Sequence, residues 1–476
     1  MVLDSDDYHA IYDFTTPYDH LIPAVDDPAA QFYLEVIRVY LAMCEGVISV
    51  RKAVEIAQRL REHPEFAKHP VDPSILPVSA TLKAKLIENL ETLQRYNLYT
   101  LDAIKSAYSF AFMVTDAPLR PVDLRVLQFF SENPEATNYD AAEALNIVPR
   151  TVGRSIQSLR ERHGLRFSYL IDTTAFGIHS FMLFFKLSDG VRWSDVESGL
   201  ADFPFTRSIL RTTMSETGYA SFLFPGNENR VHAFESSINR LVGRVFEQVT
   251  LHSQIGMART TALSLYDGNR WAFPEQLESV LDTSVPPPRI DSNRTLWCGG
   301  PKRGLSPLDF VIASQLRIDG RASARKIRDN LRLMGIDMSA PSVAYSIRKI
   351  RERGIMLPFV AFGGVGLSTN FCFEIVCDES WKQRILGFSQ LLPSSFAYLS
   401  DHGMILWIDV PSMHQVRYYK LFRSLENENG VHFVQPIMTV GLSGSRPMDD
   451  LSRHWNASDR GWSVDPSVLD LSRYLY

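Results

Sequence analysis

The sequence predicts an α+β multidomain chain, in which a helical N-terminal domain precedes two copies of one α+β unit. Three observations carry this prediction. The chain has 476 residues, enough for about three domains of ordinary size. A set of landmarks recurs about 190 positions further along the chain. Each copy starts with helical periodicity and then alternates strand and helix patterns.

Composition narrows the class of protein before any motif is considered. Hydrophobic residues make up 45% and charged residues 22% of the chain, as in a globular protein. The first 19 residues contain five Asp and neither Lys nor Arg, so we expect no secretory signal. Apolar runs are too short for a membrane helix, and we expect a cytoplasmic protein without membrane contact.

Cysteines are few and widely spaced, at Cys44, Cys298, Cys372 and Cys377. Their spacing does not suggest a disulfide framework or a structural zinc site. No Ser-His-Asp order, phosphate loop or HExxH motif stands out, so we expect no catalytic residues, metal or cofactor. The net charge of −5 means that any nucleic-acid surface must be a local patch.

The internal repeat is visible as several matched landmarks in one order. Three landmarks of the first copy are Pro121–Leu124, Val152–Arg162 and Phe176-Gly177, and their counterparts are Pro307–Phe310, Val343–Arg353 and Val365-Gly366. The offset grows from 186 to 191 because five extra residues fall near Arg332–Asp337. The tails also match, at Asp267–Trp271 and Asp459–Trp462, where we expect both tryptophans to be packed anchors.

These landmarks predict the domain boundaries. We expect a helical domain over 1–118, a winged helix-turn-helix over 119–173 and a ferredoxin-like domain with a tail over 174–284. A Gly/Pro-rich linker over 285–304 leads to the second winged helix-turn-helix over 305–363 and the second ferredoxin-like domain over 364–476. The N-terminal domain contains three helical stripes, which begin at Phe32, at Leu82 (with Thr81 as cap) and at Ile104.

The third helix of each copy, over 149–163 and 340–354, has the pattern of a DNA-recognition helix. One face is apolar, at Val152, Ile156 and Leu159 in the first copy. The other face is polar and cationic, which suits insertion into the major groove of double-stranded DNA. The candidate DNA-binding residues are Arg150, Thr151, Arg154, Gln157 and Arg160 in copy one, and Ser342, Tyr345, Arg348, Lys349 and Arg351 in copy two.

The helix start and the segment after each recognition helix can also be predicted. Ser339 is placed to cap the second helix, whereas Val148 is a weak start for the first. Gly164 and Gly354 end the two helices, and the extended segments 166–171 and 357–362 would form the wings. The rest of each copy reads βαββαβ, with strands at 181–187, 207–213, 220–224 and 245–252 in copy one and at 371–376, 397–399, 404–410 and 432–438 in copy two.

Each unit resembles the leucine-responsive regulator (Lrp/AsnC) family. The carriers of this resemblance are Asp123-Leu124 and Asp309-Phe310, the recognition pattern over 151–162, and the turns Ser215–Gly218 and Ser400–Gly403. The resemblance implies a sequence-specific transcription regulator of archaeal type. It also implies RAM-type ferredoxin-like sheets that pair, a homodimer formed through them, and a small-molecule effector near Gly218 and Gly403.

Charge segregation separates the two copies and leaves alternatives open. Residues 302–353 contain twelve Lys and Arg against five acids, whereas 120–166 contain seven Arg against six acids. We therefore expect the second copy to bind DNA more strongly. One alternative is an enzyme like the sirohaem decarboxylases, which share this layout, with His163 and His179 as candidates. The other is an assembly protein that does not bind DNA.

Overall fold

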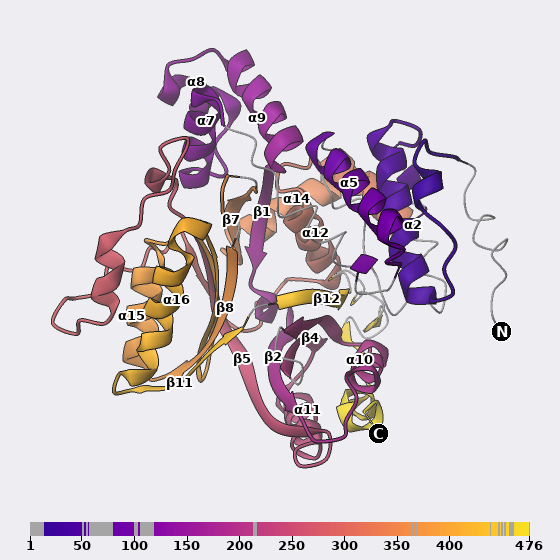
Figure 1. Cartoon of the computed structure of the whole chain (residues 1–476), viewed down its shortest axis with the longest axis vertical. Coiled ribbons are helices and arrows are strands. Elements are labelled where there is room, and N and C mark those ends of the chain that lie inside the picture. The colour runs from indigo at the N-terminus through magenta and orange to yellow at the C-terminus, as the bar shows by residue number, and fades with distance from the viewer. Residues whose placement is uncertain are drawn as a thin grey trace.

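The computed structural model describes residues 14–49, 52, 53, 56, 80–99, 103, 104, 119–212, 217–363, 365–367, 369–437, 439–445, 448, 451, 454–456 and 461–475. In the N-terminal part, α2 spans Pro28–Cys44 and α5 spans Ala80–Tyr96, at the right of Figure 1. The stripes predicted to begin at Phe32 and at Leu82 lie on these two helices. Because α5 already begins at Ala80, Thr81 is not its cap. Most of the third stripe lies outside the described residues.

Two three-helix headpieces follow, one in each unit. Headpiece 1 contains α7 (Pro121–Glu132), α8 (Asn138–Leu145) and α9 (Pro149–His163), and headpiece 2 contains α12 (Pro307–Ile318), α13 (Ala324–Leu333) and α14 (Ala340–Glu352). The second helices are capped by Thr137 and Ser323, 186 positions apart. The five extra residues therefore lengthen α13 and the turn after it.

The ends of the recognition helices α9 and α14 follow local chemistry. The Ser339 hydroxyl accepts the backbone N–H of Ser342 at 3.2 Å, which confirms the predicted cap. At the same position of α9, Val148 provides no side-chain bond. Gly164 ends α9 with a φ of +58°, a left-handed conformation that favours glycine.

Each headpiece is followed by a βαββαβ domain, which confirms the α+β fold class. The first comprises β2 (Ile178–Leu187), α10 (Trp193–Asp202), β3 (Thr206–Thr212), β4 (Thr217–Pro225), α11 (Glu228–Asn239) and β5 (Phe246–Thr261). The second comprises β8 (Thr369–Cys377), α15 (Glu379–Ser389), β9 (Ser394–Ser400), β10 (Gly403–Val410), α16 (Gln415–Ser424) and β11 (Val431–Ile437).

The two four-stranded sheets join into one ten-stranded sheet with the path β11-β8-β10-β9-β5-β2-β4-β3-β12, where β12 is Thr439–Ser445 and β6 (Thr295–Trp297) pairs beside β5. The first half of β5 pairs with β2 of its own unit and the second half with β9 of the other unit. In return, β12 pairs with β3 of the first unit. Strand exchange of this kind makes the two units mutually dependent.

Side chains from both units fill the space between the two half-sheets. This shared core contains Met182 and Phe184 from β2, Tyr219 from β4, and Cys372, Tyr398, Ile405 and Ile437 from the second unit. The sheet faces predicted to pair two chains therefore lie against each other inside one chain. Association of two chains stays a prediction, and it would need another surface.

The segments predicted as wings form strands that pair across the two units. Strand β1 (Arg166–Ile171) pairs antiparallel with β7 (Met356–Ala361) of the other unit. Ser168 pairs with Phe359 and Tyr169 with Pro358, so corresponding residues of the repeat exchange partners about one centre. This is the register that a two-fold axis imposes on two identical chains, and here it arises within a single chain.

The tails confirm the same pseudo-two-fold relation. Trp271 of the first tail donates its Nε1–H to the Val365 carbonyl of the second unit, with the two atoms 2.5 Å apart. Trp462 of the second tail donates to the Phe176 carbonyl of the first unit at 2.8 Å. Phe176 and Val365 are matched landmarks of the repeat, so each tryptophan anchors its tail to the opposite unit.

Both tails pack on helices of the opposite ferredoxin-like domain. Figure 1 shows the C-terminal segment beside α10 and α11, and the segment after β5 beside α15. Arg384 of α15 is buried, and its guanidinium donates to the carbonyls of Ser279, Val280, Asp282 and Val285. Among the described helices, none combines the length and apolar character needed to cross a membrane.

Candidate nucleic-acid interface and the pocket between the headpieces

Helix α9 presents the predicted surface with few competing contacts. Its apolar residues Val152, Ile156 and Leu159 are buried in the headpiece core. On the other face Arg150, Arg154 and Arg160 are exposed, and none has a hydrogen-bond or ion-pair partner within the described residues. Thr151 is half-buried beside them, and the Gln157 amide donates to Glu161 at 2.7 Å. Three guanidinium groups are therefore available to an incoming polyanion.

Helix α14 presents fewer cations without an ion-pair partner than its sequence suggests. Arg348 is exposed and lies beside the exposed Tyr345, with its guanidinium carbon 5.8 Å from the ring centroid. Lys349, in contrast, forms an ion pair of 2.6 Å with Asp309, whose side chain is only 1% exposed. The Ser342 hydroxyl lies 2.8 Å from that of Ser339, within the helix cap.

Other cations of headpiece 2 are also paired. Lys326 contacts Asp319 at 2.8 Å, Arg328 contacts Asp329 at 2.6 Å and Arg332 contacts Asp337 at 3.4 Å. The five acids of residues 302–353 are already subtracted from their twelve Lys and Arg, so these pairs leave the excess of positive charge unchanged. The expectation that the second headpiece binds DNA more strongly stays a prediction.

The N-terminal domain borders the first of these surfaces. Helix α5 lies against α9, although the two are separated by more than fifty residues of chain (Figure 1). The exposed face of α5 carries Glu88, Glu91 and Arg95. Arg150 and Arg154, near the start of α9, remain exposed in this arrangement.

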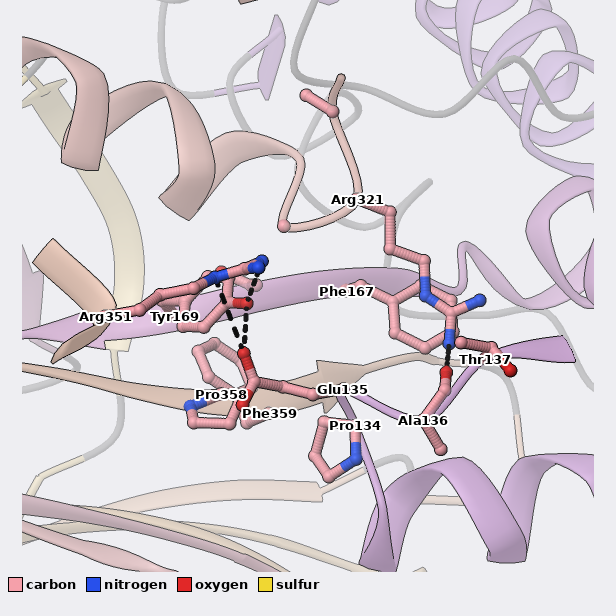
Figure 2. A pocket seen from close by; sticks show the side chains of 13 residues that line it. Pro134, Glu135, Ala136, Thr137, Phe167, Tyr169, Arg321, Arg351, Pro358 and Phe359 are labelled. Atoms are coloured by element: carbon pink, nitrogen blue, oxygen red, sulfur yellow. Dashed lines mark hydrogen bonds and ion pairs between the residues drawn. The ribbon is translucent and has the colours of Figure 1, made fainter. Parts of the chain in front are cut away.

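A pocket of about 290 Å³ lies where the two headpieces meet above the β1–β7 ribbon. Figure 2 shows that the turn before α8, the turn before α13, α14 and the two strands all contribute to it. Glu135 and Arg321 occupy the same position in the two copies, 186 residues apart. The repeat therefore places residues of opposite charge at corresponding positions of one pocket.

Arg321 crosses from headpiece 2 to headpiece 1. Its guanidinium donates to the Ala136 carbonyl at 2.8 Å and to Asn138 Oδ1 at 3.1 Å. The guanidinium carbon lies 3.5 Å from the centroid of the Phe167 ring, a close cation–π contact. Burial, together with the nearby Arg160, lowers the pKa of Arg321 to about 10.

Arg351, Tyr169 and Glu135 form the other end of the pocket. The Tyr169 hydroxyl donates to Glu135 Oε1 at 2.8 Å and accepts from Arg351 Nη2 at 3.0 Å. Arg351 Nε lies 3.7 Å from the same carboxylate oxygen. Burial and the hydrogen bond to Glu135 raise the pKa of Tyr169 to about 12, so the phenol stays protonated at neutral pH. Arg351, predicted to contact DNA, is thus directed into the pocket.

Sequence reasoning missed Glu135, Tyr169 and Arg321 as members of a site. None belongs to a motif, and they come from segments up to 186 residues apart. A position-by-position comparison of the two copies would have flagged the change from Glu135 to Arg321. Their meeting at one pocket could not be foreseen, because it depends on how the headpieces pack.

Both candidate effector glycines are explained by close packing. A Cβ at Gly218 would lie 2.3 Å from the indole of Trp193. Gly403 has a φ of +147°, and a Cβ there would lie 2.1 Å from the Ile375 carbonyl oxygen. Glycine is required at these positions for steric reasons, and an effector role there stays a prediction.

A buried Ser-His-Glu cluster joins the two half-sheets. His252 Nδ1 lies 2.8 Å from the Ser400 hydroxyl, and Nε2 lies 3.0 Å from Glu374 Oε1. The residue types match those of hydrolase triads, but His252 and Ser400 are 0% exposed and Glu374 is 3% exposed. A substrate has no access to this hydroxyl, so the cluster acts as a polar bond within the core.

The histidines proposed for the enzyme alternative have packing roles. His163 is buried, with Nδ1 3.2 Å from the Gly363 carbonyl oxygen. His179 lies within β2, stacks on Phe181, and has its pKa lowered by burial. Within the described residues, no group of three or more His, Cys, Asp or Glu is placed to hold a metal ion.

A second arginine site lies between the ribbon and the second half-sheet. The Arg259 guanidinium carbon is 4.8 Å from the centroid of the Phe359 ring, and Asp409 and Arg166 are close enough to influence its charge. Its Nε is buried without a hydrogen-bond partner among the described residues. Burial lowers the pKa of Arg259.

Comparison with known proteins gives likenesses of fold. No family model matches the chain, and no curated protein matches it significantly. The siroheme decarboxylase NirDL covers 74% of this chain and 98% of its own at 10% identity, with a TM-score of 0.37. Its co-complex with an iron-uroporphyrin III analogue covers 68% and 93% at 12% identity, with a TM-score of 0.35.

A transcriptional regulator is similar over a smaller part of the chain. The regulator from Neisseria meningitidis in complex with L-Met covers 28% of this chain and 88% of its own. The identity is 17% and the TM-score 0.21. Likenesses of this size concern the fold alone and decide nothing about the activity of this chain.

Proposed function

We propose that the chain is a DNA-binding transcription regulator with two recognition helices in one polypeptide. The observation that carries this proposal is the face of α9 on which Arg150, Arg154 and Arg160 are exposed and unpaired among the described residues. Guanidinium groups on a helix of this kind bind phosphates and base edges in the major groove. This regulator would act in the cytoplasm.

The pseudo-two-fold relation between the two units supports a DNA site that has matching symmetry. DNA readers related by a two-fold axis bind pseudo-palindromic sites, with one half-site for each recognition helix. The sequence of α9 over 150–154 is Arg-Thr-Val-Gly-Arg, whereas the sequence of α14 over 341–345 is Pro-Ser-Val-Ala-Tyr. We expect two half-sites of different sequence, because the two helices carry different side chains at their base-reading positions.

The test measures binding of double-stranded DNA as a function of salt. A duplex selected from a random pool would be titrated by fluorescence anisotropy between 50 and 300 mM salt, with wild type, Arg154→Ala and Arg348→Ala. Each substitution should weaken binding about tenfold and reduce the salt slope by about one. Lys349 is left unchanged, because its ammonium group neutralises the buried Asp309.

Arg289→Ala is the matched control, because Arg289 is exposed and lies outside both headpieces. It removes one positive charge and should leave affinity and slope unchanged. The proposal fails if wild type shows no salt-dependent affinity, or if Arg154→Ala and Arg348→Ala behave like the control.

A second candidate is an enzyme that acts on a planar carboxylated substrate, such as a tetrapyrrole. What favours it is Arg259, whose buried Nε lacks a partner among the described residues beside the Phe359 ring. Titration with iron-uroporphyrin separates the two candidates. A shifted Soret band in wild type that is lost in Arg259→Gln would favour the enzyme, and an unchanged spectrum would favour the regulator.

A further inference from the structure

The pocket between the headpieces has the composition of a site for a small anion. Position 135 of the first copy corresponds to position 321 of the second, and Arg160 of α9 corresponds to Arg351 of α14. The pseudo-two-fold relation brings each helix arginine close to the turn of the opposite headpiece. Arg351 lies 3.7 Å from the carboxylate of Glu135, whereas Arg160 is near enough to Arg321 to lower its pKa.

Positive charge is therefore in excess around the pocket. Arg351 and Arg321 both line it and Arg160 is nearby, whereas Glu135 is the single carboxylate among its lining residues and the nearby Asp319 is paired with Lys326. Like charges held in a partly desolvated space repel each other more strongly than in water. An anion relieves that repulsion and supplies a second acceptor for guanidinium N–H groups.

Arg351 still has donor capacity for a ligand. Its Nη2 donates to the Tyr169 hydroxyl, and its Nε is 3.7 Å from Glu135, beyond hydrogen-bond distance. Nη1 has no hydrogen-bond partner among the described residues. About half of the Arg351 side chain remains exposed. Figure 2 shows Arg351 and Arg321 at opposite ends of the pocket, with Tyr169, Glu135 and Phe167 between them.

The walls of the pocket are apolar and limit the ligand in size. Phe359, Pro358 and Pro134 line it between the two arginines. A volume of about 290 Å³ is at the lower end of the range for small-molecule sites. These walls suit a compact ligand with a short apolar body rather than a nucleotide or a peptide.

We infer that this pocket binds a small organic anion, whose carboxylate or phosphate is held by Arg351 and whose body lies against Phe359 and Pro358 toward Arg321. Because residues of both headpieces form the pocket, a bound anion would hold the two headpieces in one relative position. The consequence for DNA rests on the function proposed above, whereas anion binding does not depend on it.

The experiment measures anion binding without DNA, by isothermal titration of the full chain with benzoate, inorganic phosphate and neutral benzamide. We expect wild type to bind benzoate or phosphate, and the stronger of the two identifies the charged group. Arg351→Gln should weaken that binding at least tenfold. Glu135→Gln should strengthen it several-fold, because the anion no longer competes with a carboxylate for Arg351.

Arg325→Gln is the matched control, since Arg325 is exposed on α13 outside the pocket and should bind the anion as wild type does. Circular dichroism checks that each variant is folded. The inference is overturned if neutral benzamide binds as tightly as the stronger of the two anions, if neither anion binds, or if Arg351→Gln and Glu135→Gln both match wild type. Because no DNA is present, loss of DNA binding in a separate assay would refute only the proposed function.

Discussion

The two headpieces share one fold but differ in where their cations are used. At one pair of corresponding positions, Ser158 of α9 lies 3.3 Å from Asp123, whereas Lys349 of α14 forms an ion pair with Asp309. Asp123 is instead neutralised by Arg120, at 2.7 Å. The buried aspartate at this corresponding position is thus neutralised by a different cation in each copy. In the first copy the cation precedes the first helix, and in the second it belongs to the recognition helix.

This difference shows why charge counted along a sequence is a poor measure of a binding surface. Headpiece 2 has the larger net positive charge, yet on its recognition helix Lys349 neutralises Asp309 and Arg351 lies beside Glu135. Headpiece 1 has almost no net charge, yet α9 keeps three arginines unpaired among the described residues. The placement of cations on the recognition helix, as well as the net charge of the headpiece, determines what a polyanion meets.

The largest expected difference between the headpieces concerns the buried aspartates. Lys349→Ala should lower the free energy of unfolding by about 2 kcal/mol, because it leaves the Asp309 carboxylate buried and unneutralised. Ser158→Ala should cost less than about 1 kcal/mol, since Arg120 still neutralises Asp123. Urea denaturation followed by circular dichroism measures both. Equal costs for the two variants would contradict the comparison.

The two tryptophan anchors should differ less in their contribution to the free energy of unfolding. Trp271→Phe removes a hydrogen bond to the Val365 carbonyl from a residue that is only 3% exposed, and should cost about 1.5 kcal/mol. Trp462 makes the equivalent bond but is half-buried, so Trp462→Phe should cost about 1 kcal/mol. Thermal midpoints of the two variants test this order. A negligible effect of either substitution would show that this tryptophan does not anchor its tail to the opposite unit.

The smallest expected effects concern the N-cap residue that precedes each recognition helix. Ser339→Ala removes the cap of α14 and should cost about 1 kcal/mol. Val148→Ser adds a hydroxyl at the uncapped start of α9 and should add up to about 1 kcal/mol of stability. Thermal denaturation of both variants checks the two signs. A destabilising Val148→Ser would mean that the exposed valine makes a contact which the cap cannot replace.

Much of the fold could be predicted because it depends on local pattern. The three helices of each headpiece follow apolar spacings of three and four, and the βαββαβ order follows alternating strand and helix patterns. The duplication was visible from matched landmarks, and the five-residue insertion lies at the end of α13 as expected. The caps at Ser339 and Gly164 were predictable since they depend on neighbouring residues alone.

By itself, the sequence determined the elements, their order and the duplication, because these depend on side-chain periodicity and short-range hydrogen bonds. Only the tertiary structure decided that β1 pairs with β7, that each tryptophan anchors to the opposite unit, and that Arg351 meets Glu135 and Tyr169 in one pocket. Such contacts join residues up to 286 positions apart. They arise from packing two units about a shared axis, which leaves no local signature in the chain.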